Sequence, residues 1–111
     1  MTIIQRNEKG VIVLNLSDNI ASDGVAILKN FIKPYLEDQT VQTIIINLEK
    51  INFIDSSGIG LIISVFKKLL ERKAKLILTN MNEKNIELFE MMHLNKILTL
   101  YETESEALKN V

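Results

Sequence analysis

Two short and almost wholly apolar segments, TIIINL at 43–48 and KLILT at 75–79, restrict the fold of this chain more than any other feature. Such segments are typical of strands that are buried on both faces, as in parallel sheets covered by helices. Between them, apolar residues recur at helical spacing from Ile59 to Leu70, which predicts an amphipathic helix of about four turns. A strand, a helix and a second strand in this order predict a parallel pair joined by a right-handed crossover.

The N-terminal residues predict an antiparallel hairpin. Residues 2–6 and 11–16 have the composition of short strands, and a short polar connection rich in turn residues joins them. The first strand is expected at the edge of the sheet, where its unpaired backbone groups favour weak pairing with a second copy. We therefore expect a monomer or a weak homodimer.

A helix is expected after residues 17–23, which form a polar and irregular segment. Apolar residues recur at helical spacing over 25–37, and Ser22 and Asp23 are the candidate caps. Pro34 lies inside this pattern and lacks the backbone N–H that a helical hydrogen bond needs, so it is expected to loosen the last turn.

The alternation of strands and helices continues to the C-terminus. Residues 51–54 are expected to be irregular, and Asn82 is the candidate cap of a helix that runs to Met92. Residues 96–101 then predict a last strand, and residues 102–108 predict a short acidic helix.

The complete order, β-β-α-β-α-β-α-β-α, predicts fold class α/β. With 111 residues the chain has the length of one domain, which we expect to span 1–111. The sheet is expected to be mostly parallel with an N-terminal antiparallel hairpin, and about four helices are expected on one or both of its faces.

The composition excludes several classes of site. Cysteine is absent, which excludes disulfides, thiolate zinc sites, iron–sulfur clusters and thiol catalysis. His93 is the single histidine, so no site can be built on two imidazoles. With 13 basic and 14 acidic residues, the net charge of −1 offers no electrostatic basis for direct binding of nucleic acid. The sequence therefore predicts no metal site and no cofactor.

No apolar run approaches the roughly 20 residues that a membrane-spanning helix needs. The N-terminus carries no signal-peptide pattern, and neither end fits a lipidation signal. We therefore expect a cytoplasmic protein without membrane insertion.

Two further groups of residues have alternative interpretations. Met91 and Met92 are interpreted as adaptable core residues and His93 as a residue at the end of a helix. One basic cluster is either a solvated helix face or a docking surface for an acidic partner, and it comprises Lys67, Lys68, Arg72, Lys73 and Lys75.

The segment Asp55-Ser56-Ser57-Gly58 is chemically the most unusual part of the chain. It follows a buried strand and opens a helix, and functional groups concentrate beyond the carboxyl ends of parallel strands. A helix start tolerates anions, because its first backbone N–H groups are unpaired. Gly58 and Gly60 lack side chains, so the backbone of another protein could approach there closely. The simpler alternative is a plain helix cap.

Three enzyme motifs do not match this segment. The hydrolase elbow needs glycine two residues before the serine, and the phosphate loop needs Gly-Lys-Ser or Gly-Lys-Thr. A dinucleotide fingerprint would need a third glycine where Ile63 stands. No base accompanies Asp55 and the serines, so a small enzyme or nucleotide-binding protein is the least supported alternative.

The segment NFIDSSGIGLIISVFKKL at 52–69 resembles the signature of the STAS domain family, the anti-sigma factor antagonists. In that family a buried strand runs into Asp-Ser-Ser-Gly-Leu/Ile-Gly, which opens an amphipathic helix. The tail LFEMMHLNKILTLYETESEAL at 88–108 also resembles the family pattern, so the resemblance covers nearly the whole chain.

The resemblance implies a regulatory protein-binding module that is switched by phosphorylation and is not an enzyme. Its partner would be an anti-sigma factor that is itself a serine kinase, which it binds when Ser57 is unmodified, thereby freeing a sigma factor. Phosphorylation of Ser57 would end the binding, and a serine phosphatase would restore it. The partner-binding residues implied by the resemblance are Ala21, Asp23, Asp55, Ser56, Ser57, Gly58, Ile59 and Gly60.

One passage departs from the family pattern, which has Gly-x-Leu/Ile-Asp after the second strand. Asp18 stands at the glycine position and Ala21 at the aspartate position, while Ile20 keeps the apolar member. Asp23 could replace the missing aspartate if the loop is shifted by two residues. The departure favours an alternative function, a constitutive STAS adaptor in a transporter or signalling complex that phosphorylation does not switch.

Overall fold

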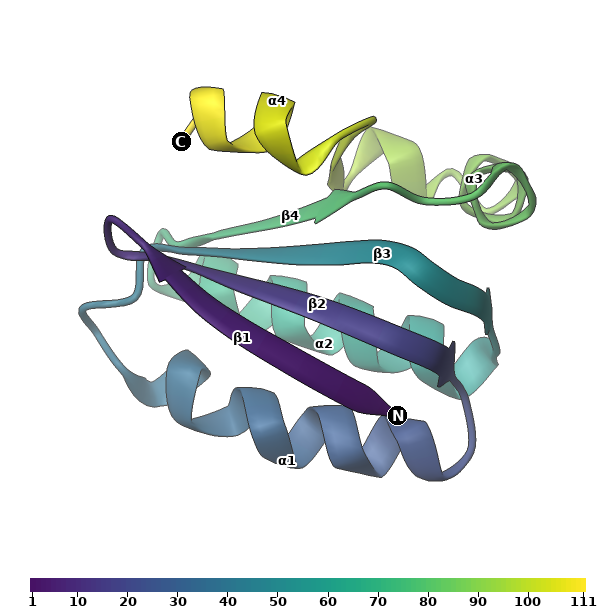
Figure 1. Ribbon diagram of the computed structural model, residues 1–111, viewed down its shortest axis with the longest axis horizontal. Coiled ribbons are helices and arrows are strands. Elements are labelled where there is room, and N and C mark those ends of the chain that lie inside the picture. The colour runs from purple at the N-terminus through teal and green to yellow at the C-terminus, as the bar shows by residue number, and fades with distance from the viewer.

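The computed structural model describes residues 1–111 and contains a five-stranded sheet with the strand order β1-β2-β3-β4-β5 (Figure 1). The first pair is antiparallel and the other pairs are parallel, which confirms the predicted α/β fold and its N-terminal hairpin. None of the helices is both long enough and apolar enough to cross a bilayer. In chain order the elements are β1 (Thr2–Glu8), β2 (Val11–Ile20), α1 (Asp23–Glu37), β3 (Thr43–Ile54), α2 (Ser56–Glu71), β4 (Lys75–Thr79), α3 (Glu83–Met91), a 3₁₀ turn (Leu94–Lys96), β5 (Thr99–Tyr101) and α4 (Glu104–Lys109).

The hairpin between β1 and β2 closes through Lys9 and Gly10. Both residues have positive φ, 54° and 85°, as a two-residue hairpin turn of the primed type requires. The register from Thr2↔Ser17 to Glu8↔Val11 is unbroken, so β1 forms a regular edge strand, as predicted.

Three predicted boundaries are wrong. β2 continues to Ile20 and β3 continues to Ile54, although residues 17–23 and 51–54 were expected to be irregular. The two strands pair along this extension through two register shifts, so ladder hydrogen bonds hold residues whose polarity indicated a loop. The last strand covers only Thr99–Tyr101, because a 3₁₀ turn occupies the start of the predicted segment 96–101.

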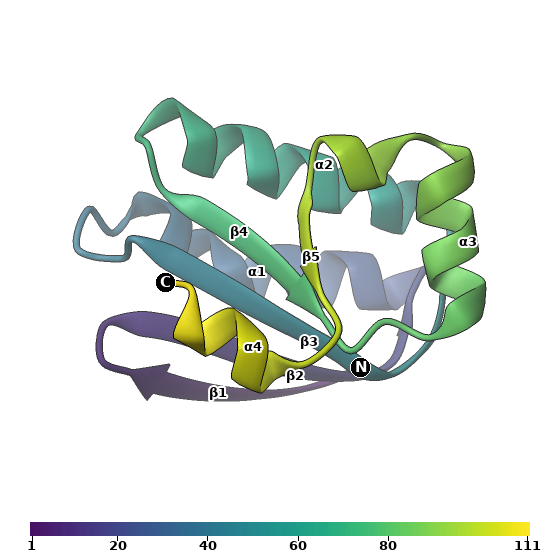
Figure 2. The ribbon, with the colours of Figure 1, turned by 90° about the horizontal axis from the view of Figure 1, so that it is seen from above.

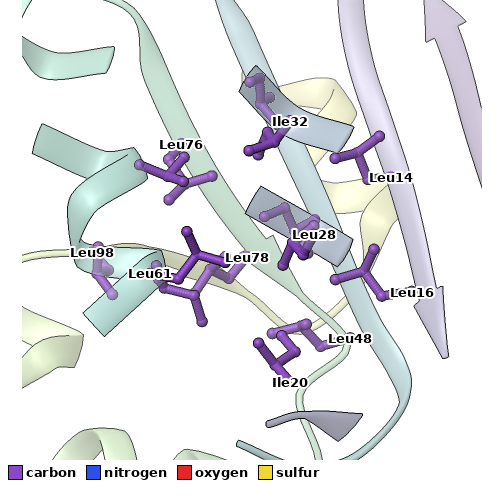
Figure 3. Close-up of a cluster of buried hydrophobic side chains, with 14 of the residues drawn as sticks. Leu14, Leu16, Ile20, Leu28, Ile32, Leu48, Leu61, Leu76, Leu78 and Leu98 are labelled. Atoms are coloured by element: carbon purple, nitrogen blue, oxygen red, sulfur yellow. The ribbon is translucent and has the colours of Figure 1, made fainter. Parts of the chain in front are cut away.

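Helices cover both faces of the sheet. α1 and α2 lie against one face and α4 against the other, with α3 beyond the carboxyl end of β4 (Figures 1 and 2). Because side chains alternate along a strand, Leu14 packs in the large cluster towards α1 and α2, whereas Val13 packs towards α4. Figure 3 shows Leu14 of β2, Leu28 of α1 and Leu78 of β4 in the large cluster, which contains 23 buried residues.

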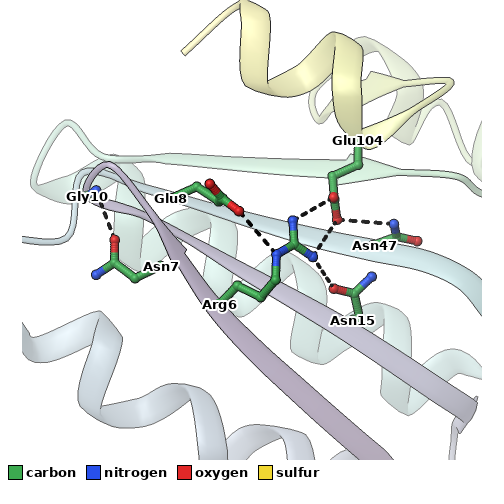
Figure 4. A network of polar contacts seen from close by, with 7 residues as sticks. All are labelled: Arg6, Asn7, Glu8, Gly10, Asn15, Asn47 and Glu104. Carbon is green, nitrogen blue, oxygen red and sulfur yellow. Dashed lines mark hydrogen bonds and ion pairs between the residues drawn. The ribbon is translucent and has the colours of Figure 1, made fainter.

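A polar network attaches α4 to the hairpin (Figure 4). The guanidinium of Arg6 contacts Glu104 Oε2 at 2.7 Å and donates to Asn15 Oδ1 at 2.9 Å, and Asn47 donates to Glu104 Oε1 at 3.3 Å. Burial by itself raises the pKa of Glu104, but the hydrogen bonds from Arg6 and Asn47 outweigh it and lower that pKa. Glu104 is therefore held as a carboxylate between α4 and the sheet.

Arg72 was assigned to a basic cluster interpreted as either a solvated helix face or a docking surface, but it is half-buried and bound within the chain. Its guanidinium donates to the carbonyl oxygens of Tyr35 at 3.1 Å, Leu36 at 3.2 Å and Val41 at 2.6 Å. Arg72 therefore joins the end of α2 to the end of α1 and the segment before β3. The lysines of the same cluster are exposed.

The interpretation of Met91 and Met92 as core residues is wrong. Their exposed fractions are 74% and 46%, whereas Phe89 in the same turn of α3 is fully buried, so this turn directs Phe89 and not the methionines into the core. His93 follows that turn with a left-handed φ of 60°, which agrees with the prediction of a residue at the helix end.

Candidate functional site at the start of α2

The connections β2–α1 and β3–α2 lie side by side at one end of the sheet (the right-hand end in Figure 1). Ile20, the last residue of β2, pairs with Ile54, the last residue of β3. The N–H of Asp55 donates to the carbonyl of Ile20 at 3.2 Å, and Asn19 Oδ1 accepts the N–H of Phe53 at 3.3 Å. Parallel pairing therefore places the first connection next to the serines at the start of α2.

Asp55 caps α2 and holds the hydroxyl of Ser57. Its backbone is extended, with φ −87° and ψ −178°, and its Oδ1 accepts the N–H of Gly58 at 2.8 Å. The same oxygen accepts the Ser57 hydroxyl at 2.6 Å. The hydrogen bond from the Ser57 hydroxyl is the largest cause that holds the pKa of Asp55 below its usual range. The hydrogen bond from the N–H of Gly58 lowers that pKa further, and the N–H of Ser22 contributes in the same direction. Asp55 is thus an ionised acceptor that orients the Ser57 hydroxyl.

Both serines are accessible. Ser56 and Ser57 are exposed and occupy the first two positions of α2. A hydroxyl at this position can receive a phosphoryl group without leaving water, and the positive end of the helix dipole tolerates the added charge.

Gly58 serves the chain's own packing, which corrects the interpretation that a partner's backbone approaches it. Gly58 is buried, and an added Cβ would lie 2.1 Å from the carbonyl oxygen of Ile20. Ile59 is 5% exposed and belongs to the large core cluster. Gly60, in contrast, is exposed, and an added Cβ there would meet no atom within 4 Å. Of these three residues, only Gly60 leaves open surface beside the serines.

A surface cavity of about 450 Å³ brings Ala21 and Asp23 together with Ile27 and Phe53. Ala21 is half-buried and Asp23 is exposed in the first turn of α1, while the carboxylate that contacts Ser57 is Asp55. Sequence reasoning missed Ile27 and Phe53, whose exposed fractions are 44% and 46%. No simple sequence signal marks Phe53, because Asn52 and Phe53 are both exposed between buried Ile51 and Ile54 and the strand does not alternate there.

Two residues, one near the end of β2 and one in the β2–α1 connection, have backbone conformations that favour glycine. Asp18 has φ 91°, and Ser22 has φ 50° with ψ −125°. Ser22 precedes α1 but makes no side-chain capping hydrogen bond, so its side chain does not offset this strain. Strained backbone next to an accessible serine is typical of a functional site.

The model of the STAS domain family matches residues 2–107 of this chain. The chain is 23% identical over 108 residues to the anti-sigma F factor antagonist of Paenibacillus polymyxa, with 97% of this chain and 92% of that protein covered. It is 31% identical over 61 residues to the anti-sigma-B factor antagonist of Listeria monocytogenes, with 55% of this chain and 54% of that protein covered.

Solved structures show the same fold. An anti-sigma factor antagonist from Mycobacterium paratuberculosis has a TM-score of 0.89 at 22% identity, covering 99% of this chain and 92% of that chain. The antagonist SpoIIAA in its unphosphorylated form has a TM-score of 0.77 at 23% identity, covering 98% and 96%. The phosphorylated form of SpoIIAA, from Bacillus, has a TM-score of 0.77 at 24% identity, covering 98% of each chain.

Proposed function

The chain belongs to the STAS domain family, and from that premise we propose that it is an anti-sigma factor antagonist switched by phosphorylation of Ser57. In this proposal the unmodified chain binds an anti-sigma factor that is a serine kinase, which frees a sigma factor. The kinase phosphorylates Ser57 and the complex separates, and a serine phosphatase restores the binding form. The chain itself supplies a binding surface and no catalysis.

The observation that carries the proposal is the exposure of the Ser57 hydroxyl together with its hydrogen bond to Asp55. This hydroxyl is exposed at the start of α2 and is held by the ionised carboxylate of Asp55 at 2.6 Å. Because the hydroxyl hydrogen points to Asp55, a lone pair of Ser57 Oγ is free to attack a phosphoryl group from solvent. In this proposal Asp55 orients the Ser57 hydroxyl, which Ala21 cannot do because its side chain has no hydrogen-bond acceptor.

Release of the partner follows from charge and desolvation. A phosphoryl group adds about −1.5 to −2 charges at pH 7, next to the carboxylate of Asp55. The apolar side chains of Ile27 and Phe53 stand at the same end of the sheet and are the natural centre of a contact surface. Covering that surface would desolvate the phosphate, so a coupling of about 1–3 kcal/mol between modification and binding is expected. Asp23, Ser56 and Gly60 complete the exposed part of this surface.

A second candidate is a constitutive STAS adaptor of a transporter or signalling complex. Ala21 favours it, because an alanine stands where the family pattern has an aspartate. In an adaptor, Asp55 and Ser57 only cap α2, and modification of Ser57 leaves the partner bound.

The two candidates differ in their response to charge at Ser57. Wild type, Ser57→Asp and the matched control Ser56→Asp are each used to capture partners from a lysate of the native organism, followed by mass spectrometry. Aspartate carries about half of the charge of a phosphate. The proposal expects wild type and Ser56→Asp to retain a kinase-type anti-sigma factor, and Ser57→Asp to lose it at least fivefold.

Incubation of the captured complex with Mg-ATP then tests the modification. The proposal expects a phosphate on Ser57 in the wild type and none in Ser57→Ala. Equal retention of one non-kinase partner by all three proteins would establish the adaptor function and overturn the switch.

A further inference from the structure

An apolar groove lies beside α3, away from the Ser57 site. Its volume is about 460 Å³, and it lies between the start of α3 and the carboxyl ends of β4 and β5. Figure 2 shows these elements next to one another. Leu78 in the lining is fully buried, whereas Met81, Ile86, Leu100 and Tyr101 are half-buried. The groove thus offers apolar surface that a partner can remove from water.

The lining contains two charged residues, and both are acidic. Glu83 and Glu102 line the groove, and both are exposed. Glu87 and Glu90 are also exposed and follow Glu83 by four and seven residues, so the three share one face of α3. None of these glutamates takes part in an ion pair of the structure. The ion pairs are formed by Met1 with Asp18 and by Arg6 with Glu8 and Glu104.

The acidic face extends the groove in one direction. From Glu83 to Glu90 it runs about 10 Å along the helix axis. It ends beside Met91, the most exposed large apolar side chain of the chain at 74%. Methionine is flexible and polarisable and is frequent at surfaces that accept apolar partners.

We propose that this groove and the acidic face of α3 form a docking surface for a segment of a partner protein that is apolar on one side and positively charged on the other. Apolar side chains of the segment enter the groove, and its lysines and arginines lie against Glu83, Glu87, Glu90 and Glu102. A small molecule confined to the groove could not reach Glu90 or Met91, whereas a peptide segment can contact both. None of the lining residues belongs to the connections β2–α1 or β3–α2, so this docking surface is separate from the Ser57 site.

The test uses the full chain labelled with ¹⁵N and a synthetic amphipathic peptide with leucines on one helical face and lysines on the other. The expected result is a set of amide shifts confined to α3 and to residues 78–81 and 100–102, with an affinity that falls as salt is added. A peptide of the same composition with a scrambled order is expected to bind at least fivefold more weakly, because it cannot present apolar and charged sides together.

Two double variants test the specificity. Glu83→Lys/Glu102→Lys reverses the charge of the groove rim and is expected to raise the dissociation constant at least fivefold. Glu37→Lys/Glu71→Lys makes the same charge change at the exposed ends of α1 and α2 and is expected to leave it within twofold. The proposal is overturned if both double variants weaken binding equally, or if the amide shifts spread over the other faces of the chain.

Discussion

The hydroxyl of Ser57 donates to Asp55 Oδ1 at 2.6 Å, and the same oxygen accepts the N–H of Gly58 at 2.8 Å. One carboxylate oxygen therefore caps α2 and holds the proposed modification site at the same time. A phosphoryl group on Ser57 would remove the hydroxyl donor and add negative charge beside an ionised carboxylate. The state of Ser57 is thus coupled to the N-terminal cap of α2.

Replacing Ser57 by alanine should raise the pKa of Asp55 towards its ordinary value of 3.8, because the hydroxyl of Ser57 is the largest cause of the lowering. The carboxyl ¹³C shift of Asp55, followed by NMR as a function of pH, measures this change. Ser56→Ala is the matched control and should leave the titration unchanged. An unaltered Asp55 titration in Ser57→Ala would contradict the hydrogen bond.

Alanine at Gly58 and at Gly60 should have opposite effects on stability. At Gly58 an added Cβ would lie 2.1 Å from the carbonyl oxygen of Ile20, so Gly58→Ala should lower the free energy of unfolding by about 2 kcal/mol or more. At Gly60 an added Cβ meets no atom within 4 Å, and alanine favours the helix by up to about 1 kcal/mol. Urea unfolding of both variants measures the difference, and equal effects would contradict the close approach at Gly58.

Glycine at position 22 should stabilise the chain. Ser22 holds φ 50° with ψ −125°, and its side chain makes no capping hydrogen bond. Relief of that strain should raise the free energy of unfolding. Glycine also increases the conformational entropy of the unfolded chain, which opposes the gain, so the net increase is expected to be about 1 kcal/mol. Ser22→Ala keeps the strain and should bring no gain. A gain in Ser22→Ala equal to that in Ser22→Gly would show that the backbone conformation is not the cause.

The ion pair between Arg6 and Glu104 should make the free energy of unfolding depend on pH in the acidic range. The folded-state pKa of Glu104 is lowered from 4.5, so its contribution is present above 4.5 and is lost as the pH falls through the lower folded value. Glu104→Gln should cost about 1 kcal/mol at pH 7 and progressively less below pH 4.5. Urea unfolding at a series of pH values measures this. Glu106→Gln, exposed on the same helix, is the control, and an equal pH dependence in both variants would contradict the role of Glu104.

Patterns confined to one element predicted most of the fold. The runs TIIINL and KLILT predicted parallel strands, and the spacing from Ile59 to Leu70 predicted the helix after the serines. The strand boundaries were predicted wrongly where polar residues pair with a neighbouring strand, as in the second half of β3. Composition alone does not reveal that such a neighbour is present. The prediction for Met91 and Met92 was wrong for a related reason, since apolar character does not reveal which side of a helix turn faces the core, and here that side carries Phe89.

The sequence by itself determined the order and type of the elements, the family resemblance and the position of the accessible serines. Periodicity and capping depend on neighbours within a few residues, so they can be recognised in the chain. Only the tertiary structure decided which residues far apart in the sequence meet. Gly58 lies against the carbonyl of Ile20, Arg72 joins α2 to α1, and Phe53 stands beside Ala21, because strand register and helix packing set those contacts.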